Sequence, residues 1–210
     1  MAELFPLSNE EARILGVLVE KQATVPDTYP LSLNALVAGC NQKTGRDPVM
    51  DISEARALEA LDSLRSRDLV IESSGSRVAR YSHNVARAFQ LPTPAVALMT
   101  QLVLRGPQTA AELRSRCERI YRFADISSVE AFLEELAARP AGALTRMLPR
   151  TPGTRENRWA HLLCGEPEFA PEASSPDRES IAELADEVRR LREEVAELRA
   201  ELAELRERII

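Results

Sequence analysis

The chain has 210 residues, of which 44% are hydrophobic and 29% charged, which is typical of a globular protein with a core of its own. Aromatic residues make up only 4%, so few side chains are suited to stacking on single-stranded nucleic acid. No apolar run is long enough to span a membrane, and the first residues lack a secretory signal, so we expect a cytoplasmic protein. The net charge of −6 comes mainly from residues 171–210, which hold 12 Asp or Glu residues against 7 Lys or Arg.

Three helices and a hairpin are predicted in residues 1–90. The run Ser8-Asn9-Glu10-Glu11 is a capping box and predicts that a helix begins there. Ser32 and Ser53 are the predicted N-caps of two further helices. The apolar stripe of the third helix, which we expect to be buried, consists of Ala57, Leu58, Leu61 and Leu64. Two predicted strands, at 69–72 and 78–82, complete the element order of a winged helix-turn-helix domain.

Residues 91–164 repeat this order. Helices are predicted over 95–105, from the capping box 109–112 and from a second capping box at 127–130, and strands over 144–148 and 158–163. We therefore predict a mainly α fold with small β wings, made of two tandem winged helix-turn-helix domains. The residues that we expect in the two cores are Leu36, Leu61, Leu64, Leu98, Leu113, Phe132 and Leu136.

The C-terminal segment carries a heptad pattern. Residues 165–179 are rich in Pro, Glu, Ser and Ala, which predicts a flexible linker, and residues 180–210 follow as a coiled-coil helix. Glu residues at position g and Arg residues at position e favour a parallel dimer. The alternatives are a trimer, since no Asn at an a position specifies the oligomeric state, and a single helix that docks on the rest of the chain. The predicted dimerisation residues are Ile181, Leu184, Val188, Leu191, Val195, Leu198, Leu202, Leu205 and Ile209.

Catalytic and metal-binding patterns are missing from the sequence. The two histidines, His83 and His161, have neither triad nor metal-ligand spacing, the three cysteines lie far apart, and no glycine-rich phosphate loop is found. We therefore expect no enzymatic activity, no cofactor and no metal.

A DNA-binding surface is predicted on the first domain, because its third helix occupies the recognition position of a winged helix. Glu59 and Asp62 on this helix weaken the positive field. The loop at 41–48 has a second interpretation, as a polar connector whose Asn and Gln side chains satisfy backbone groups. The candidate DNA-binding residues are Lys43, Arg46, Arg56, Ser63, Arg67, Arg77 and Arg80.

The third helix of the second domain is acidic instead. Glu130, Glu134 and Glu135 are predicted to face outward, where they would repel DNA. The cations of this domain lie around its second helix and its wing. This arrangement is compatible with wing-led DNA binding, with a protein ligand, or with surface arginines that have no function.

Several long motifs resemble one family. The runs Tyr-Pro-Leu-Ser-Leu-Asn at 29–34 and Cys-Asn-Gln-Lys-Thr-Gly-Arg-Asp-Pro-Val-Met at 40–50 are similar to the signature of the YceH family of bacterial proteins. Leu-Arg-Gly-Pro-Gln-Thr at 104–109 and Arg-Glu-Asn-Arg-Trp-Ala-His-Leu at 155–162 agree with it. The resemblance covers about residues 7–163 and implies tandem winged-helix domains, but it supplies no biochemical role and no site residues.

Two functions are compatible with these features. The leading interpretation is a dimeric winged-helix protein that binds double-stranded DNA and acts as a regulator, with one helix in the major groove. The alternative is a protein-interaction adaptor that uses the tandem winged-helix domains without direct DNA binding; the acidic second recognition helix favours it. Fold analogy alone does not decide between them.

Overall fold

The computed structural model describes residues 6–73, 78–150, 156–166 and 190. The chain divides into a first compact unit, residues 1–167, and a second unit, residues 168–210. The predicted linker and all nine dimerisation residues of the heptad lie outside the described residues. None of the described helices is long and apolar enough to cross a membrane.

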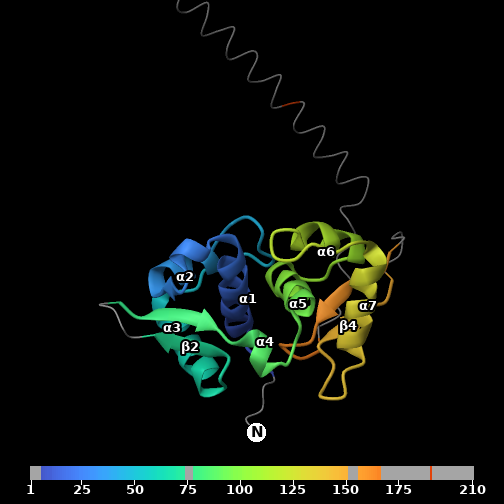
Figure 1. Cartoon of the computed structure of the whole chain (residues 1–210). Coiled ribbons are helices and arrows are strands. Elements are labelled where there is room, and N and C mark those ends of the chain that lie inside the picture. The colour runs from blue at the N-terminus through green and yellow to red at the C-terminus, as the bar shows by residue number, and fades with distance from the viewer. Residues whose placement is uncertain (1–5, 74–77, 151–155, 167–189, 191–210) are drawn as a thin grey trace, which may run out of the picture. The chain divides into compact units, whose positions relative to one another are not determined.

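The first unit is mainly helical and contains two small antiparallel sheets (Figure 1). We refer to residues 6–91 as the first half and to residues 92–166 as the second half. The elements of the first half are α1 (Asn9–Thr24), the short 3-10 helix η1 (Pro26–Thr28), β1 (Leu31–Ser32), α2 (Leu33–Cys40), α3 (Glu54–Ser66), β2 (Val70–Ser73), β3 (Arg80–His83) and α4 (Val85–Ala88). Those of the second half are α5 (Thr93–Arg105), α6 (Ala110–Cys117), α7 (Ile126–Ala137), β4 (Thr145–Met147) and β5 (Trp159–His161).

Local capping determines where most of these helices begin. Ser8 caps α1 in a capping box, in which the Glu11 amide donates to Ser8 Oγ at 3.1 Å and the Ser8 amide donates to Glu11 Oε2 at 2.6 Å. Ser32, Ser53 and Thr109 cap α2, α3 and α6 as predicted. These predictions are confirmed because a cap needs only residues within the same turn.

Helix α7 begins earlier than the sequence predicted. Its N-cap is Asp125, whose carboxylate accepts from the Ser128 amide at 2.7 Å, and the predicted capping box at 127–130 is wrong. The Ser128 side chain instead completes the box from the N3 position. Ile126 thereby becomes the first helical residue.

The two sheets are short and separate. In the first half, β3 lies between β1 and β2, with Leu31 opposite Tyr81 and Val70 opposite His83. Strand β1 was not predicted, because two residues carry no periodic signal and their partner is about fifty positions away. In the second half, β4 pairs with β5, with Met147 opposite Trp159.

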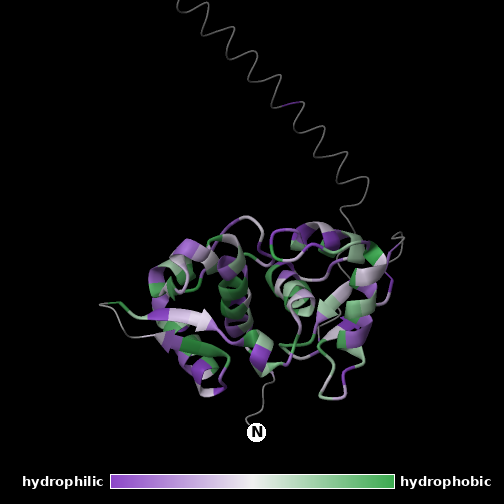
Figure 2. Ribbon diagram, viewed as in Figure 1, coloured by the Kyte–Doolittle hydropathy of each residue, from purple (hydrophilic) through white to green (hydrophobic). Residues whose placement is uncertain are grey.

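Helices α1 and α5 lie side by side in the middle of the first unit, each surrounded by the other helices of its half (Figure 1). Their buried residues lie on every side, as in helices without a solvent-facing stripe. Figure 2 shows the hydrophobic middle of α1 within this arrangement. At the contact, Gly16 of α1 admits the Leu104 side chain of α5, which would lie 2.9 Å from an added Cβ.

One hydrophobic core extends across both halves. It contains residues of α1 and α3 together with Leu136, Leu144 and Leu163 of the second half. A smaller second core lies within the second half, around Leu98, Leu113 and Leu133. Of the seven predicted core residues, all are buried except Phe132, which is partly buried at the edge of the second core.

The predicted stripe of α3 contains one error. Ala57, Leu61 and Leu64 are buried, but Leu58 is 41% exposed. The buried face is completed by Ala60 instead, which follows the i, i+3, i+4, i+7 spacing of one helix face. Leu58 lies about 100° around the helix from Ala57 and therefore faces away from the core.

Candidate functional site

The loop between α2 and α3 holds the longest family motif, and its arginine is buried. Arg46 is 6% exposed, and its guanidinium donates to both carboxylate oxygens of Glu20 on α1, at 3.2 and 2.6 Å. It also donates to the carbonyl of Gly39 and to Gln42 Oε1. Although burial alone would raise the pKa of Glu20, the hydrogen bonds and charge of Arg46 lower it below its ordinary value. Arg46 therefore holds the loop in place and does not face solvent.

Other polar residues of this loop also bind the protein's own backbone. Asn41 donates to the Ile52 carbonyl at 2.9 Å and accepts from the Ile52 amide at 2.8 Å. Arg13 of α1 is buried and donates to the carbonyls of Cys40 and Pro48. The Asp47 amide donates to the Leu104 carbonyl at the end of α5. The loop thus joins the two halves, which agrees with the polar-connector interpretation of its amides.

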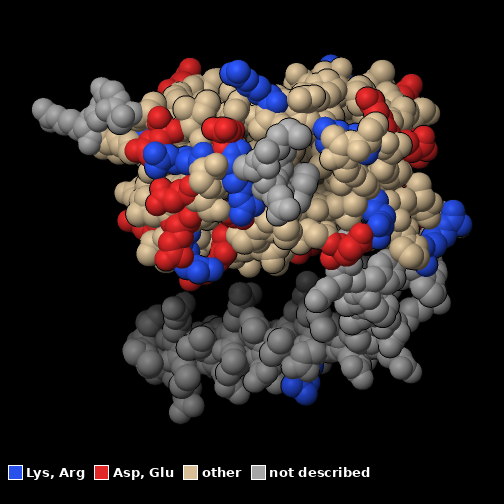
Figure 3. Space-filling view, turned by 90° about the horizontal axis from the view of Figure 1, so that it is seen from below, with Lys and Arg blue, Asp and Glu red and all other residues tan. Residues whose placement is uncertain are grey.

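Arg56 of α3, and Arg67 directly after this helix, form ion pairs with carboxylates of α1 and α3. Arg56 lies 2.9 Å from Glu10 and 3.3 Å from Glu59. Arg67 lies 3.7 Å from Glu11 and donates to the Pro6 carbonyl. Both arginines line a shallow cavity of about 390 Å³, and the partly buried Ser63 lines it with them. Figure 3 shows positive and negative side chains intermingled on the first half, so this face has no uniform charge.

The remaining predicted DNA-binding residues that the structure describes are not found in this cavity. Arg80 of β3 is exposed and donates to the Pro30 carbonyl at 2.8 Å. Lys43 is exposed, and no described residue lies within ion-pair distance of it. Arg77 lies outside the described residues. The structure therefore brings Arg56, Ser63 and Arg67 together and places Arg46 in the interior.

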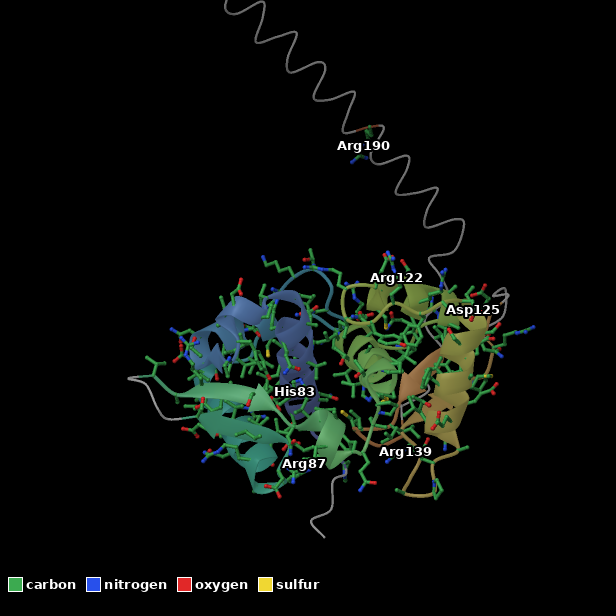
Figure 4. All side chains as sticks on the ribbon, viewed as in Figure 1. His83, Arg87, Arg122, Asp125, Arg139 and Arg190 are labelled. Carbon is green, nitrogen blue, oxygen red and sulfur yellow. The ribbon has the colours of Figure 1, made fainter. Side chains whose placement is uncertain are left out.

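The second half has a groove between α7, the N-terminus of α6 and the β4–β5 sheet. Its volume is about 350 Å³. The buried Trp159 of β5 lies at its base, and two apolar side chains at its walls are exposed, Ile126 by 42% and Met147 by 44%. Glu130 and Glu134 line it from α7. In Figure 4, the labelled Asp125 marks the N-terminal end of α7, the helix that forms this wall of the groove.

In the described residues, the carboxylates of α7 have no ion pairs like those of the α3 arginines. Within the described ranges, no Lys or Arg nitrogen lies within 4.0 Å of Glu130, Glu134 or Glu135. Glu156 adds a further carboxylate. Arg150 is the one cation among the described lining residues, and it donates to Asn157. Sequence analysis found the acidic face of α7 but missed Ile126 and Met147. No local sequence pattern could have revealed them, because their exposure depends on how α7 and β4 pack.

Cations around α6 line a neighbouring cavity, in which Arg114 and Arg122 lie with Ala111 and Ile126 of the groove wall. Arg122, labelled in Figure 4, pairs with Glu118 at 3.2 Å, and Arg114 donates to the Ala124 carbonyl. Arg116 donates to Gln108 Oε1 at 2.7 Å. Each of these arginines thus has a partner within the same half.

The titratable groups of the described residues do not form a reactive cluster. Burial raises the pKa of Cys40 and of Cys117 to about 12, so both thiols stay protonated at neutral pH. Burial also lowers the pKa of His83 and of His161 to about 4, so both imidazoles are neutral. No group of three or more His, Cys, Asp or Glu side chains in the described ranges could hold a metal ion.

Comparison with known proteins identifies the family. The family described as "Protein of unknown function, DUF480" matches residues 7–154. A UPF0502 protein of Dechloromonas aromatica (strain RCB) is 67% identical over 168 residues, which is 80% of this chain and 79% of the relative. UPF0502 proteins of Leptothrix cholodnii and of Burkholderia ambifaria are each 63% identical, covering 78% and 84% of this chain and 73% of either relative. The chain belongs to this family, which confirms the resemblance inferred from its motifs.

Proposed function

We propose that this protein is a tandem winged-helix adaptor that binds a partner protein through the groove of its second half. The element order in each half supports the assignment to the winged-helix class, because three helices precede a two-stranded antiparallel ladder in each. The heptad at 180–210 supports a parallel coiled-coil dimer. Sedimentation of the full-length protein and of a Leu191→Lys, Leu198→Lys variant tests the dimer, since charges at two d positions should leave a monomer.

The observation that carries the proposal is the groove at α7. A recognition helix that enters the major groove needs cations or neutral hydrogen-bonding groups on its outer face. Helix α7 instead presents Glu130, Glu134 and Glu135, beside the exposed Ile126 and Met147. Exposed apolar side chains at a concave surface with a charged rim are typical of a protein-binding site.

The first half supports the same conclusion by its internal ion pairs. Phosphate contacts require Lys or Arg side chains that can exchange water and counterions for phosphate. Arg46 is buried with Glu20, and Arg56 and Arg67 already contact carboxylates. Binding of DNA at this face would break these pairs and would bring Glu10 and Glu59 close to the phosphates.

Site-specific photo-crosslinking in the source bacterium tests the proposal. A photoreactive phenylalanine analogue replaces Ile126 in the groove or, as the matched control, Leu58, which is equally exposed on α3. We expect a protein crosslink of defined mass from position 126 and none from position 58. The absence of a crosslink from position 126, or the same crosslink from both positions, would contradict the proposal.

Duplex DNA binding remains the second candidate, because one cationic region is favourable to it. Arg105 at the end of α5 has no hydrogen-bond or ion-pair partner among the described residues and lies beside Gly45 of the loop. Burial and the positive charges of Arg116 and Arg46 lower its pKa, while the negative charge of Glu20 acts in the opposite direction. The exposed Lys43 lies on the same loop.

Titration of a fluorescent random duplex with the full-length protein at increasing salt tests this candidate. A phosphate-binding surface would give an affinity that falls steeply with salt and that is lost in a Lys43→Glu, Arg105→Glu variant. The matched control is Arg56→Glu, Arg67→Glu, which changes charge equally on the ion-paired face of α3. As an adaptor, the protein should show no duplex binding at about 50 mM salt, where phosphate contacts are strongest.

A further inference from the structure

We propose that the occupant of the groove is a basic peptide segment of the partner that inserts an apolar side chain between α7 and the β4–β5 sheet. This inference rests on the proposed adaptor function and specifies the chemistry of its partner. The shape of the groove and the charge of its lining residues support this assignment.

The groove is suited to one or two apolar side chains. Its volume of about 350 Å³ is at the lower end of the range of about 300–1,000 Å³ found for small-ligand pockets. The small residues Ala110 and Ala111 of α6 line one side, and Ile126 and Met147 line the others. Methionine adapts its shape readily and is frequent where a surface accepts apolar groups. Burial of Ile126 and Met147 by an inserted side chain would remove their apolar surface from water.

The charge around the groove selects the rest of the segment. Among the described residues, three carboxylates, Glu130, Glu134 and Glu156, line it together with one cation, Arg150. Since Glu130 and Glu134 are four residues apart, they lie on the same face of α7. Lys or Arg residues on either side of the apolar anchor would therefore face carboxylates that have no ion-pair partner in the described part of the chain, whereas an acidic segment or a phosphate group would be repelled.

The chain's own C-terminal segment is a poorer match. Residues 171–210 contain 12 acidic residues against 7 basic ones, and their apolar residues already form the heptad seam. The same sign of charge on segment and groove disfavours their association. We therefore expect the occupant to belong to a separate protein.

Fluorescence anisotropy with the full-length protein and three matched synthetic peptides tests the inference. The first peptide alternates Lys with Leu, the second replaces every Lys by Glu, and the third replaces every Leu by Ser. We expect measurable binding of the first peptide only. Equal binding of the second or third peptide, or no binding of the first, would overturn the inference.

Variants of the groove locate the binding. A Glu130→Lys, Glu134→Lys variant should weaken the Lys-Leu peptide about tenfold or more, because like charges across an interface repel. Glu135→Lys, on the same helix but outside the groove, is the matched control and should change affinity less than about twofold, as expected for an exposed charge outside the contact. Ile126→Ser, with its thermal unfolding recorded, tests the apolar contribution without a change of charge. Equal loss in Glu135→Lys would overturn the inference.

Two further outcomes separate this inference from the proposed function. If position 126 crosslinks to a protein but the Lys-Leu peptide does not bind, the adaptor function stands and the basic occupant is wrong. If a synthetic peptide of residues 180–210 displaces the Lys-Leu peptide, the groove accepts the chain's own tail, which overturns the proposal of a separate basic partner.

Discussion

Helices α3 and α7 occupy the same place in the order of elements of their halves, yet their outer faces differ in how charge is compensated. On α3, Arg56 and Arg65 each contact two carboxylates within 3.3 Å. On α7, Glu130 and Glu134 have no ion-pair partner among the described residues and border exposed apolar groups. Among the described residues, the charge of α3 is therefore compensated by neighbouring side chains, whereas the carboxylates of α7 are not. The proposed partner would supply this compensation.

The loop between α2 and α3 extends this contrast. Its most polar residues are used to attach the loop to α1 and α5, through Arg46 to Glu20 and through Asp47 to Leu104. The longest family motif of the chain is therefore explained by packing between the halves. The groove of the second half uses no residue of this motif.

The largest effect is expected from Arg46→Ala. Removal of one partner from a buried ion pair leaves the other charge uncompensated, which costs about 3–5 kcal/mol of the free energy of unfolding. Urea denaturation followed by circular dichroism measures the loss. The matched control is Lys43→Ala in the same loop, which should change the free energy by less than about 0.5 kcal/mol because it is exposed. If both variants behave alike, Arg46 does not anchor the loop, and its predicted role at a DNA surface becomes the better explanation.

A second comparison uses one histidine in the last strand of each half. Burial lowers the pKa of His83 and of His161 to about 4, below the ordinary value of about 6.5. The neutral form is thus favoured in the folded state, so each residue contributes stability that is complete above about pH 6.5 and is lost as pH falls toward 4. For each histidine, the free energy of unfolding should fall by up to about 1.4 kcal/mol per pH unit within this range.

His83→Gln and His161→Gln should each reduce this slope when urea denaturation is repeated between pH 7 and pH 4.5. The environments of the two residues differ. His83 Nε2 lies 2.6 Å from Gln22 Oε1, beside α1 as Figure 4 shows, whereas His161 Nδ1 is buried with no partner among the described residues. At pH 7 we therefore expect His83→Gln to be the more destabilising of the two. An unchanged slope in both variants would mean that other groups cause the acid sensitivity.

The smallest effect on stability is expected from truncation of two exposed apolar side chains, Leu58 on the outer face of α3 and Ile126 at the start of α7. Leu58→Ala and Ile126→Ala should each change the free energy of unfolding by less than about 0.5 kcal/mol, since both side chains are more than 40% exposed. The two variants should differ in binding, because only Ile126 lines the groove. Anisotropy with the Lys-Leu peptide should therefore detect a loss for Ile126→Ala alone. A similar loss for Leu58→Ala would place part of the binding surface on the first half.

The candidate site was only partly accessible to sequence reasoning. The acidic face of α7 follows from the spacing of Glu130 and Glu134 on a helix. The groove does not, because Met147 and Trp159 reach it from strands that pair through a register that no local pattern specifies. The start of α7 was also ambiguous, since Asp125 and Ser127 are both suitable caps, and that choice decides the place of Ile126.

The sequence by itself determined six of the helices, the caps of α1, α2, α3 and α6, the two antiparallel hairpins and the family, because these depend on contacts within a turn or on motifs that can be read in order. Only the tertiary structure decided which polar residues are buried and which apolar residues are exposed. Arg46 becomes an interior residue because Glu20, twenty-six positions away, faces it from α1. Leu58 becomes a surface residue because Ala57, Ala60, Leu61 and Leu64 are the face that packs on the core. Both outcomes depend on contacts between elements distant in the chain, and these contacts cannot be predicted from composition and periodicity.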